Sequence, residues 1–145
     1  MVHRSALAAF ALLAACKGPP DPQETARAEE RMNLLTNPNL YLPTSDREYE
    51  GEDGGEVDHR LTSMIVRNTS HFAVGDLAGD VVWYGEQDQR LGSTPFSLVG
   101  SIPAGEARRF STADATMQSG KLHGVAGAVQ VVFAQVKLVE AQKRL

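Results

Sequence analysis

Side chains able to do chemistry are few in this 145-residue chain and are widely spaced. The single cysteine is Cys16, and the histidines after it are His59, His71 and His123. The sequence has no paired-histidine metal motif, nucleophile elbow, phosphate-binding loop or dinucleotide fingerprint. One cysteine also excludes an internal disulfide and a cysteine-pair metal site. The residues therefore favour a protein that is not an enzyme and that needs no cofactor.

A small hydrolase is the catalytic alternative. His71 and Asp76 fall within one predicted loop and His123 within another, and loops at one end of a sandwich can gather into a site. Such an enzyme needs these groups to converge in a pocket with a perturbed histidine pKa. We favour solvent-facing histidines over this alternative.

Cys16 follows a segment with the features of a secretory signal. Arg4 supplies a basic start, and residues 5–15 carry no charge. A helix of that length spans roughly 17 Å, about half of a bilayer core, so it is too short to cross a membrane. Ala14 and Ala15 stand directly before Cys16 and suit a signal peptidase, which needs small side chains beside the cleaved bond.

The stretch Leu13-Ala14-Ala15-Cys16 resembles the lipobox of bacterial lipoproteins. The resemblance implies that residues 1–15 are removed and that Cys16 carries fatty acyl chains such as palmitate. Two or three chains hold a protein on a membrane durably, because each buried CH₂ contributes roughly 0.8 kcal/mol. Lys17 follows the cysteine, which in enterobacteria favours the outer membrane over the inner one.

We therefore expect a protein that is lipid-anchored in the bacterial cell envelope. The periplasmic face of the outer membrane, or the cell surface, is favoured over the inner membrane. The structural alternative is a buried, unmodified Cys16 in an N-terminal helix.

Charge divides the rest of the chain into two parts. Residues 17–58 carry 11 acidic and 4 basic side chains, whereas residues 59–145 carry 7 acidic and 9 basic ones. The overall charge of −4 gives no reason to expect nucleic acid as a partner. We therefore expect a tether over residues 16–58 and a β-sandwich domain over residues 59–141.

The tether is expected to contain a short helix over about residues 22–36. Asp21 can cap this helix, Pro22 suits its first position, and Asn37 followed by a proline ends it. One face carries the apolar side chains of Ala28, Met32 and Leu35. This face either docks on the domain, which we favour, or meets a partner.

An acidic segment, residues 46–58, links the helix to the domain. Calcium binds clustered oxygen ligands, so a calcium-responsive module is an alternative function. The candidate ligands are Asp46, Glu48, Glu50, Glu52 and Asp53. An EF-hand loop counted from Asp46 has its glycine at Gly51, but it has Val57 where a glutamate is required. We therefore expect a solvated loop without a metal.

Short β-type runs broken by turn residues follow from Arg60 onward. The runs cover residues 60–68, 79–85, 96–102, 106–111, 120–124 and 128–141. No helical pattern separates them, which favours antiparallel pairing. In the last run the apolar positions change from odd to even at Phe133 and Ala134. This predicts either a β-bulge there or a first half buried on both faces. The expected fold is an antiparallel β-sandwich of six to seven strands.

Several motifs of this domain belong together. They are Asn68 at the end of the first run, Val81-x-Trp83-Tyr84, Leu91-Gly92, and Ile102-Pro103-Ala104-Gly105-Glu106 followed by Phe110. This set resembles the FxLYD-type domain, an immunoglobulin-like sandwich common in bacterial lipoproteins. Gly85 departs from the usual aspartate, and Ala104 is inserted between proline and glycine. The resemblance implies a fold and an envelope setting but no catalytic residues.

These features predict a membrane-anchored envelope lipoprotein that acts as a non-catalytic binding or assembly module for another envelope protein. Sheet edges or loops would make the contact. The candidate partner contacts are Arg108, Arg109 and Trp83, although the arginines could pair with the acidic tether and Trp83 could belong to the core. Adjacent strand residues point to opposite faces, so at most one of the two arginines serves a given surface.

Overall fold

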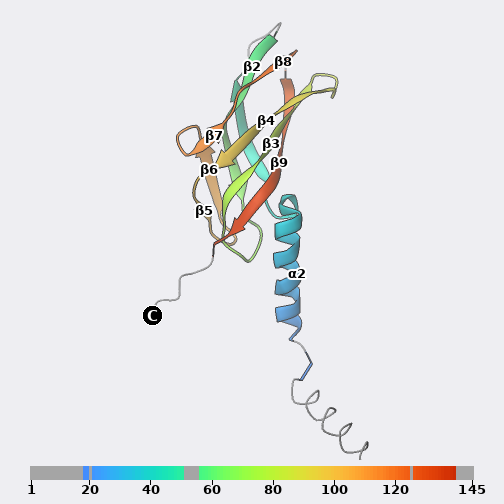
Figure 1. Ribbon diagram of the computed structural model, residues 1–145, viewed down its shortest axis with the longest axis vertical. Coiled ribbons are helices and arrows are strands. Elements are labelled where there is room, and N and C mark those ends of the chain that lie inside the picture. The colour runs from blue at the N-terminus through green and yellow to red at the C-terminus, as the bar shows by residue number, and fades with distance from the viewer. Residues whose placement is uncertain (1–17, 20, 51–55, 125, 140–145) are drawn as a thin grey trace, which may run out of the picture.

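The structure, a computed structural model, describes residues 18–19, 21–50, 56–124 and 126–139. Within these ranges it contains nine strands, one α-helix, α2, and one short 3-10 helix, η1. Figure 1 shows the strands in a sandwich, with α2 standing at one end of it. The predicted antiparallel β-sandwich is confirmed, with more strands than the six to seven expected.

Two antiparallel sheets make up the sandwich. The first pairs β2 (Glu56–Arg67) with β1 (Thr44–Glu50), β6 (Ala107–Ser111) and β8 (Gly120–His123). The second pairs β3 (Val74–Gly85) with β4 (Arg90–Leu98), β5 (Ser101–Ile102) and β9 (Ala126–Leu138), and it pairs β4 with β7 (Ala115–Met117).

Helix α2 spans Pro22–Thr36, as its capping residues predict. Asp21 Oδ1 accepts a hydrogen bond from the main-chain N–H of Gln23 at 2.9 Å, which satisfies one of the unpaired donors of the first turn. At the other end Pro38 disfavours helical backbone at Asn37 and begins η1, Pro38–Leu40. The local sequence therefore determines both ends of the helix.

The face by which α2 docks differs from the one expected. Leu34 is fully buried, whereas Met32 and Leu35 remain 67% and 48% exposed and Ala28 is exposed as well. Successive helical residues point about 100° apart, so burying Leu34 turns its neighbour away from the sandwich. The apolar stripe chosen from the sequence was thus wrong by one position at its docking end.

Part of the acidic segment expected as a loop is sheet. Asp46, Glu48 and Glu50 lie in β1, which is exposed along nearly its whole length. Edge strands often carry charged side chains, because these keep the strands of other molecules from pairing with them. The same charged residues are typical of loops, so β1 looks like a loop in the sequence. The sheets therefore begin at Thr44, before the boundary at residue 59, whereas Glu52 and Asp53 lie outside the described residues.

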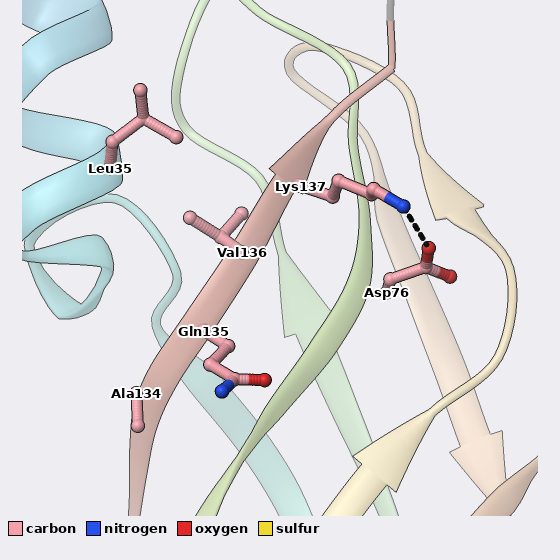
Figure 2. Close-up of a pocket in the computed structure, with 6 residues that line it drawn as sticks. All are labelled: Leu35, Asp76, Ala134, Gln135, Val136 and Lys137. Carbon is pink, nitrogen blue, oxygen red and sulfur yellow. Dashed lines mark ion pairs between the residues drawn. The ribbon is translucent and has the colours of Figure 1, made fainter.

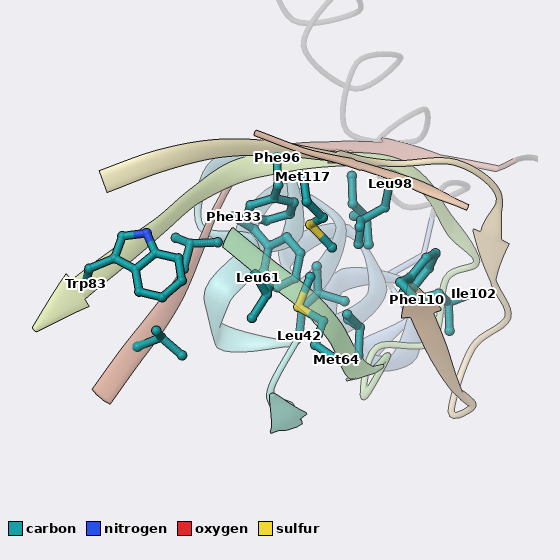
Figure 3. Close-up of a cluster of buried hydrophobic side chains, with 14 of the residues drawn as sticks. Leu42, Leu61, Met64, Trp83, Phe96, Leu98, Ile102, Phe110, Met117 and Phe133 are labelled. Carbon is teal, nitrogen blue, oxygen red and sulfur yellow. The ribbon is translucent and has the colours of Figure 1, made fainter. Parts of the chain in front are cut away.

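The core fills the space between the two sheets and includes Trp83, which is fully buried (Figure 3). The indole Nε1 donates a hydrogen bond to Thr94 Oγ1 at 3.0 Å, so its polar atom is satisfied inside the core. The rings of Tyr49 and His59 meet the indole edge-on, with centroids 5.5 and 5.4 Å away. Figure 3 labels the other large members of the cluster, among them Leu42, Leu61, Met64, Leu98, Ile102, Phe110 and Met117.

Of the two interpretations of the last strand, the β-bulge near Phe133 and Ala134 is confirmed. Gly79 of β3 pairs with Phe133, and its neighbour Ala78 pairs with Gln135, so Ala134 is the extra residue of β9. From Val129 to the bulge the odd-numbered side chains face the core, and after it the even-numbered Val136 and Leu138 pack against the core. One inserted residue thus lets both halves of β9 contribute to the same core.

Gly79→Ala tests how tightly the strands approach at this bulge. A Cβ on Gly79 would collide with the main-chain carbonyl oxygen of Val132, which no rotamer change can move. We expect the free energy of unfolding to fall by about 2 kcal/mol or more, measured by urea unfolding followed through Trp83 fluorescence. The control is Gly127→Ala, at an exposed site where the nearest atom would be Glu86 Cα at 3.3 Å. If the two variants unfold at the same urea concentration, the account of the bulge is wrong.

Candidate functional site

Helix α2 separates the predicted lipid attachment site from the sandwich. Cys16 lies outside the described residues, and its acylation stays a prediction. Pro22, the first residue of α2, follows it closely in the sequence. A helix of 15 residues is about 22 Å long. Residues 21–29 are exposed, so α2 contacts the sandwich mainly through its second half.

Glu30 joins that half of α2 to a turn of the sandwich. Its Oε1 accepts the main-chain N–H of His71 at 2.7 Å, and its Oε2 lies 2.9 Å from Nδ1 of the same histidine. Burial alone raises the pKa of Glu30, but the hydrogen bonds from His71 and the charges of His71 and Arg27 outweigh it, and the pKa lies below its usual range. Together with buried Leu34, this contact fixes α2 to the body of the protein.

The structure does not bring the candidate catalytic residues together. His71 contacts α2, and Asp76 Oδ2 lies 3.6 Å from Nζ of Lys137. His123 is the last residue of β8, which Figure 1 places at the end of the sandwich opposite α2. The convergence that a hydrolase requires is therefore not met by His71 and His123.

Both candidate arginines are engaged within the chain. Arg109 Nη2 lies 3.0 Å from Asp46 Oδ2, and its Nη1 donates to Ser63 Oγ at 2.8 Å. Arg108 lies over the Phe110 ring, 4.7 Å from its centroid, and pairs with Asp114. Arg109 therefore pairs with the acidic segment, as the alternative interpretation expected.

Trp83 was wrong as a candidate partner contact. Its side chain is fully buried and hydrogen-bonded within the core, so no second protein can reach it in the folded state. An aromatic residue in an alternating strand can face either side of the sheet, and here it faces inward.

Two of the acidic candidates for a calcium site, Asp46 and Glu50, have arginine partners. Asp46 pairs with Arg109, and Glu50 Oε1 lies 2.8 Å from Nη2 of Arg60. Across the described ranges, no three side chains of histidine, cysteine, aspartate or glutamate are arranged to hold a metal ion. Glu48 contributes its main-chain carbonyl, which accepts a hydrogen bond from Thr62 Oγ1 at 3.1 Å.

A shallow groove of about 440 Å³ runs between α2 and the end of β9. Figure 2 shows Leu35 on the helix facing Val136 on the strand, with the Asp76–Lys137 ion pair beside them. Apart from this pair, the side chains that line the groove are aliphatic or carry an uncharged amide. Within the pair, the charges of Asp76 and Lys137 neutralise each other. The groove therefore offers a contact surface rather than reactive groups.

Asn68 is a structural hub that sequence reasoning identified only as the end of a strand. Its Nδ2 donates to the carbonyl oxygens of Phe72, Ile102 and Pro103, and its Oδ1 accepts from the main chain and hydroxyl of Ser70. The side chain is fully buried, so these bonds replace water for both polar atoms. It thereby joins two turns at the end of the sandwich.

Asn39 has a role that no local signal could reveal. Its Oδ1 accepts the main-chain N–H of Phe133 at 2.7 Å, and its Nδ2 donates to the carbonyl oxygen of the same residue at 2.9 Å. The two residues are 94 positions apart in the sequence. Through this contact η1 is attached to the outer edge of β9.

No family model, curated protein or solved structure matches this chain. The resemblances to the lipobox and to the FxLYD-type domain therefore stay predictions. Searching the described residues for a membrane-spanning helix finds none with the necessary length and apolar character.

Glu30→Gln tests the contact between α2 and the sandwich. A carboxylate with a lowered pKa in the folded state stabilises above its unfolded pKa, and that contribution is lost as the pH falls through the folded pKa. We expect the parent to lose about 1 kcal/mol more than the variant between about pH 6 and pH 3, measured by urea unfolding. Glu29→Gln, at the exposed neighbouring position, is the control and should behave like the parent. If the free energy of unfolding changes with pH in the same way for the parent and for Glu30→Gln, the stabilising contact between Glu30 and His71 is contradicted.

Asn68→Ala removes all the side-chain bonds of the hub at once. We expect the free energy of unfolding to fall by about 3 kcal/mol, because buried carbonyl groups lose their donors. Thr69→Ala, which deletes one exposed hydroxyl bonded to the Tyr41 carbonyl oxygen, should lose about 1 kcal/mol or less. Thermal or urea unfolding compares them, and equal losses would refute the role of the hub.

Proposed function

We propose that this protein is an envelope lipoprotein, anchored through acyl chains on Cys16, whose sandwich binds another envelope protein without catalysis. The geometry of α2 is the observation that carries the proposal. The helix begins shortly after Cys16, extends from one end of the sandwich and is fixed there by Leu34 and Glu30 (Figure 1). A helix fixed in this way holds a domain at a defined distance from a membrane. A defined distance suits contact between the domain and a neighbouring protein.

The pairing of polar side chains supports a non-catalytic role. Asp76 and Arg109, which could serve chemistry in another setting, form ion pairs with Lys137 and Asp46, and His71 Nδ1 lies 2.9 Å from Glu30 Oε2. A catalytic group must instead present its polar atoms to a substrate within hydrogen-bond reach. These pairs favour structural roles for all three side chains.

The sequence motifs support the envelope setting. The signal-like segment, the lipobox resemblance and the FxLYD-type motifs all point to a bacterial lipoprotein. Lys17 after the cysteine favours the outer membrane, at its periplasmic face or at the cell surface. Neither the calcium-responsive module nor the hydrolase has a comparable observation in its favour.

Cys16→Ser in the full chain tests the anchor. We expect the parent to sediment with membranes and to take up labelled palmitate, and the variant to lose the label and keep residues 1–15, as read by mass spectrometry. Lys17→Ser is the matched control, because it alters the neighbouring residue and leaves the thiol in place. A Cys16→Ser variant that is processed and sediments like the parent would refute the proposal.

A further inference from the structure

Strand β9 forms an edge of its sheet that differs from the others. Among the described strands it pairs with β3 alone. Residues 126–136 contain no charged side chain and no proline. By contrast β1 carries acidic and basic side chains along its length, and β7 is only three residues long. Charge and shortness protect sheet edges from pairing with other chains, and residues 126–136 of β9 have neither.

The contact with Asn39 shows which groups of β9 face outward. Both main-chain polar groups of Phe133 bond to Asn39, so they point away from β3. In an antiparallel ladder these directions alternate, and the register from Phe133 to Val129 is unbroken. The N–H and C=O groups of Val131 and Val129 therefore point outward too. Within the part of the chain that the structure describes, nothing bonds to them on that side.

Side chains bond to the outward-facing main-chain groups at both ends of this part of β9. Asn39 covers Phe133 at one end, and Tyr49 donates its hydroxyl to the Ala126 carbonyl oxygen at 3.3 Å at the other. Between them, the outward-facing N–H and C=O groups of Val129 and Val131 have no partner among the described residues. We call this stretch, residues 127–132, the open edge of β9.

We propose that the open edge of β9 is the docking site, and that its occupant is an extended, uncharged, proline-free segment of the partner protein, added as a strand. Main-chain bonds to Val129 and Val131 would hold it, as in other cases of strand addition. The side chains beside it are Ala128, Gln130 and Val132, which offer no opposite charge to a charged residue. The inference rests on the proposed function, since it names the partner and the site of that function.

A second copy of this chain fits the edge less well. Two open edges can pair symmetrically only as antiparallel strands, which turns one molecule end over end relative to the other. Figure 1 shows that β9 runs toward the end of the sandwich where α2 stands. The two α2 helices would then extend in opposite directions, and two anchors on Cys16 could not reach one membrane.

A photo-crosslinking amino acid placed at Gln130 in the full, lipidated chain tests the proposal in the native envelope. The matched position is Ser97, which is equally exposed but lies on β4, a strand paired on both sides. We expect one adduct from Gln130 and none from Ser97. Mass spectrometry should map the adduct to an uncharged, proline-free segment of another protein.

The substitution Ala128→Lys provides a second test, because a lysine on an edge strand opposes strand addition. With the crosslinker at Gln130, Ala128→Lys should reduce the adduct several-fold, whereas Ser97→Lys should leave it unchanged. In the purified complex, amide exchange should slow at Val129 and Val131 and stay the same at Val132, which already pairs with β3. Unfolding curves of both lysine variants confirm that they are folded.

The outcomes separate this proposal from the proposed function. An adduct with a second copy, an adduct of equal yield from Ser97, or no adduct while the chain sediments with membranes would each overturn strand addition and leave the anchor standing. An adduct from Gln130 in a chain that does not sediment with membranes would support strand addition at the open edge of β9 and overturn the proposed anchor on Cys16. A charged or helical segment in the adduct would also overturn the proposed chemistry.

Discussion

The double hydrogen bond between the Asn39 side chain and the main chain of Phe133 is the contact on which the arrangement of the molecule depends. At this point β9 inserts an extra residue and changes the parity of its buried side chains. Among the described strands none pairs with the outward-facing amide and carbonyl of Phe133, and Asn39 supplies both partners. The same bond attaches η1, and through it α2, to the second sheet. Strand geometry and helix position are thus specified together.

Local signals in the sequence predicted much of the fold. Capping by Asp21 and the proline after Asn37 determine both ends of α2, because they act within a few residues. The change of parity in the last strand predicted its bulge, because a period of two cannot place both halves on one face. Edge strands were harder, since β1 is charged and β7 is short, and both properties resemble those of loops.

Contacts between distant residues account for what could not be predicted. Helical periodicity shows that α2 has an apolar side but not whether Leu34 or Leu35 meets the sandwich. Asn39 and Phe133 are far apart in the chain, and neither has a local feature that indicates the other. Arg109 and Asp46, which suggested binding sites in the sequence, pair with each other, because folding brings β1 and β6 to the same sheet. The uncharged run in β9 is a property of the sequence, but only the pairing of β9 with β3 shows that it lies at an edge.

The position of Asn39 also has a mechanical consequence. The chain leaves α2 through η1 and only then enters β1, so a force that breaks the contacts of Glu30 and Leu34 reaches η1 before it reaches β1. There Asn39 transmits part of the load to the middle of β9, which is hydrogen-bonded to β3 along most of its length. Tension would therefore be shared between the two sheets, and β1 would not be peeled from β2 by itself. Traction applied through α2 would therefore be opposed by the same bond that pairs the main chain of Phe133 beside the bulge.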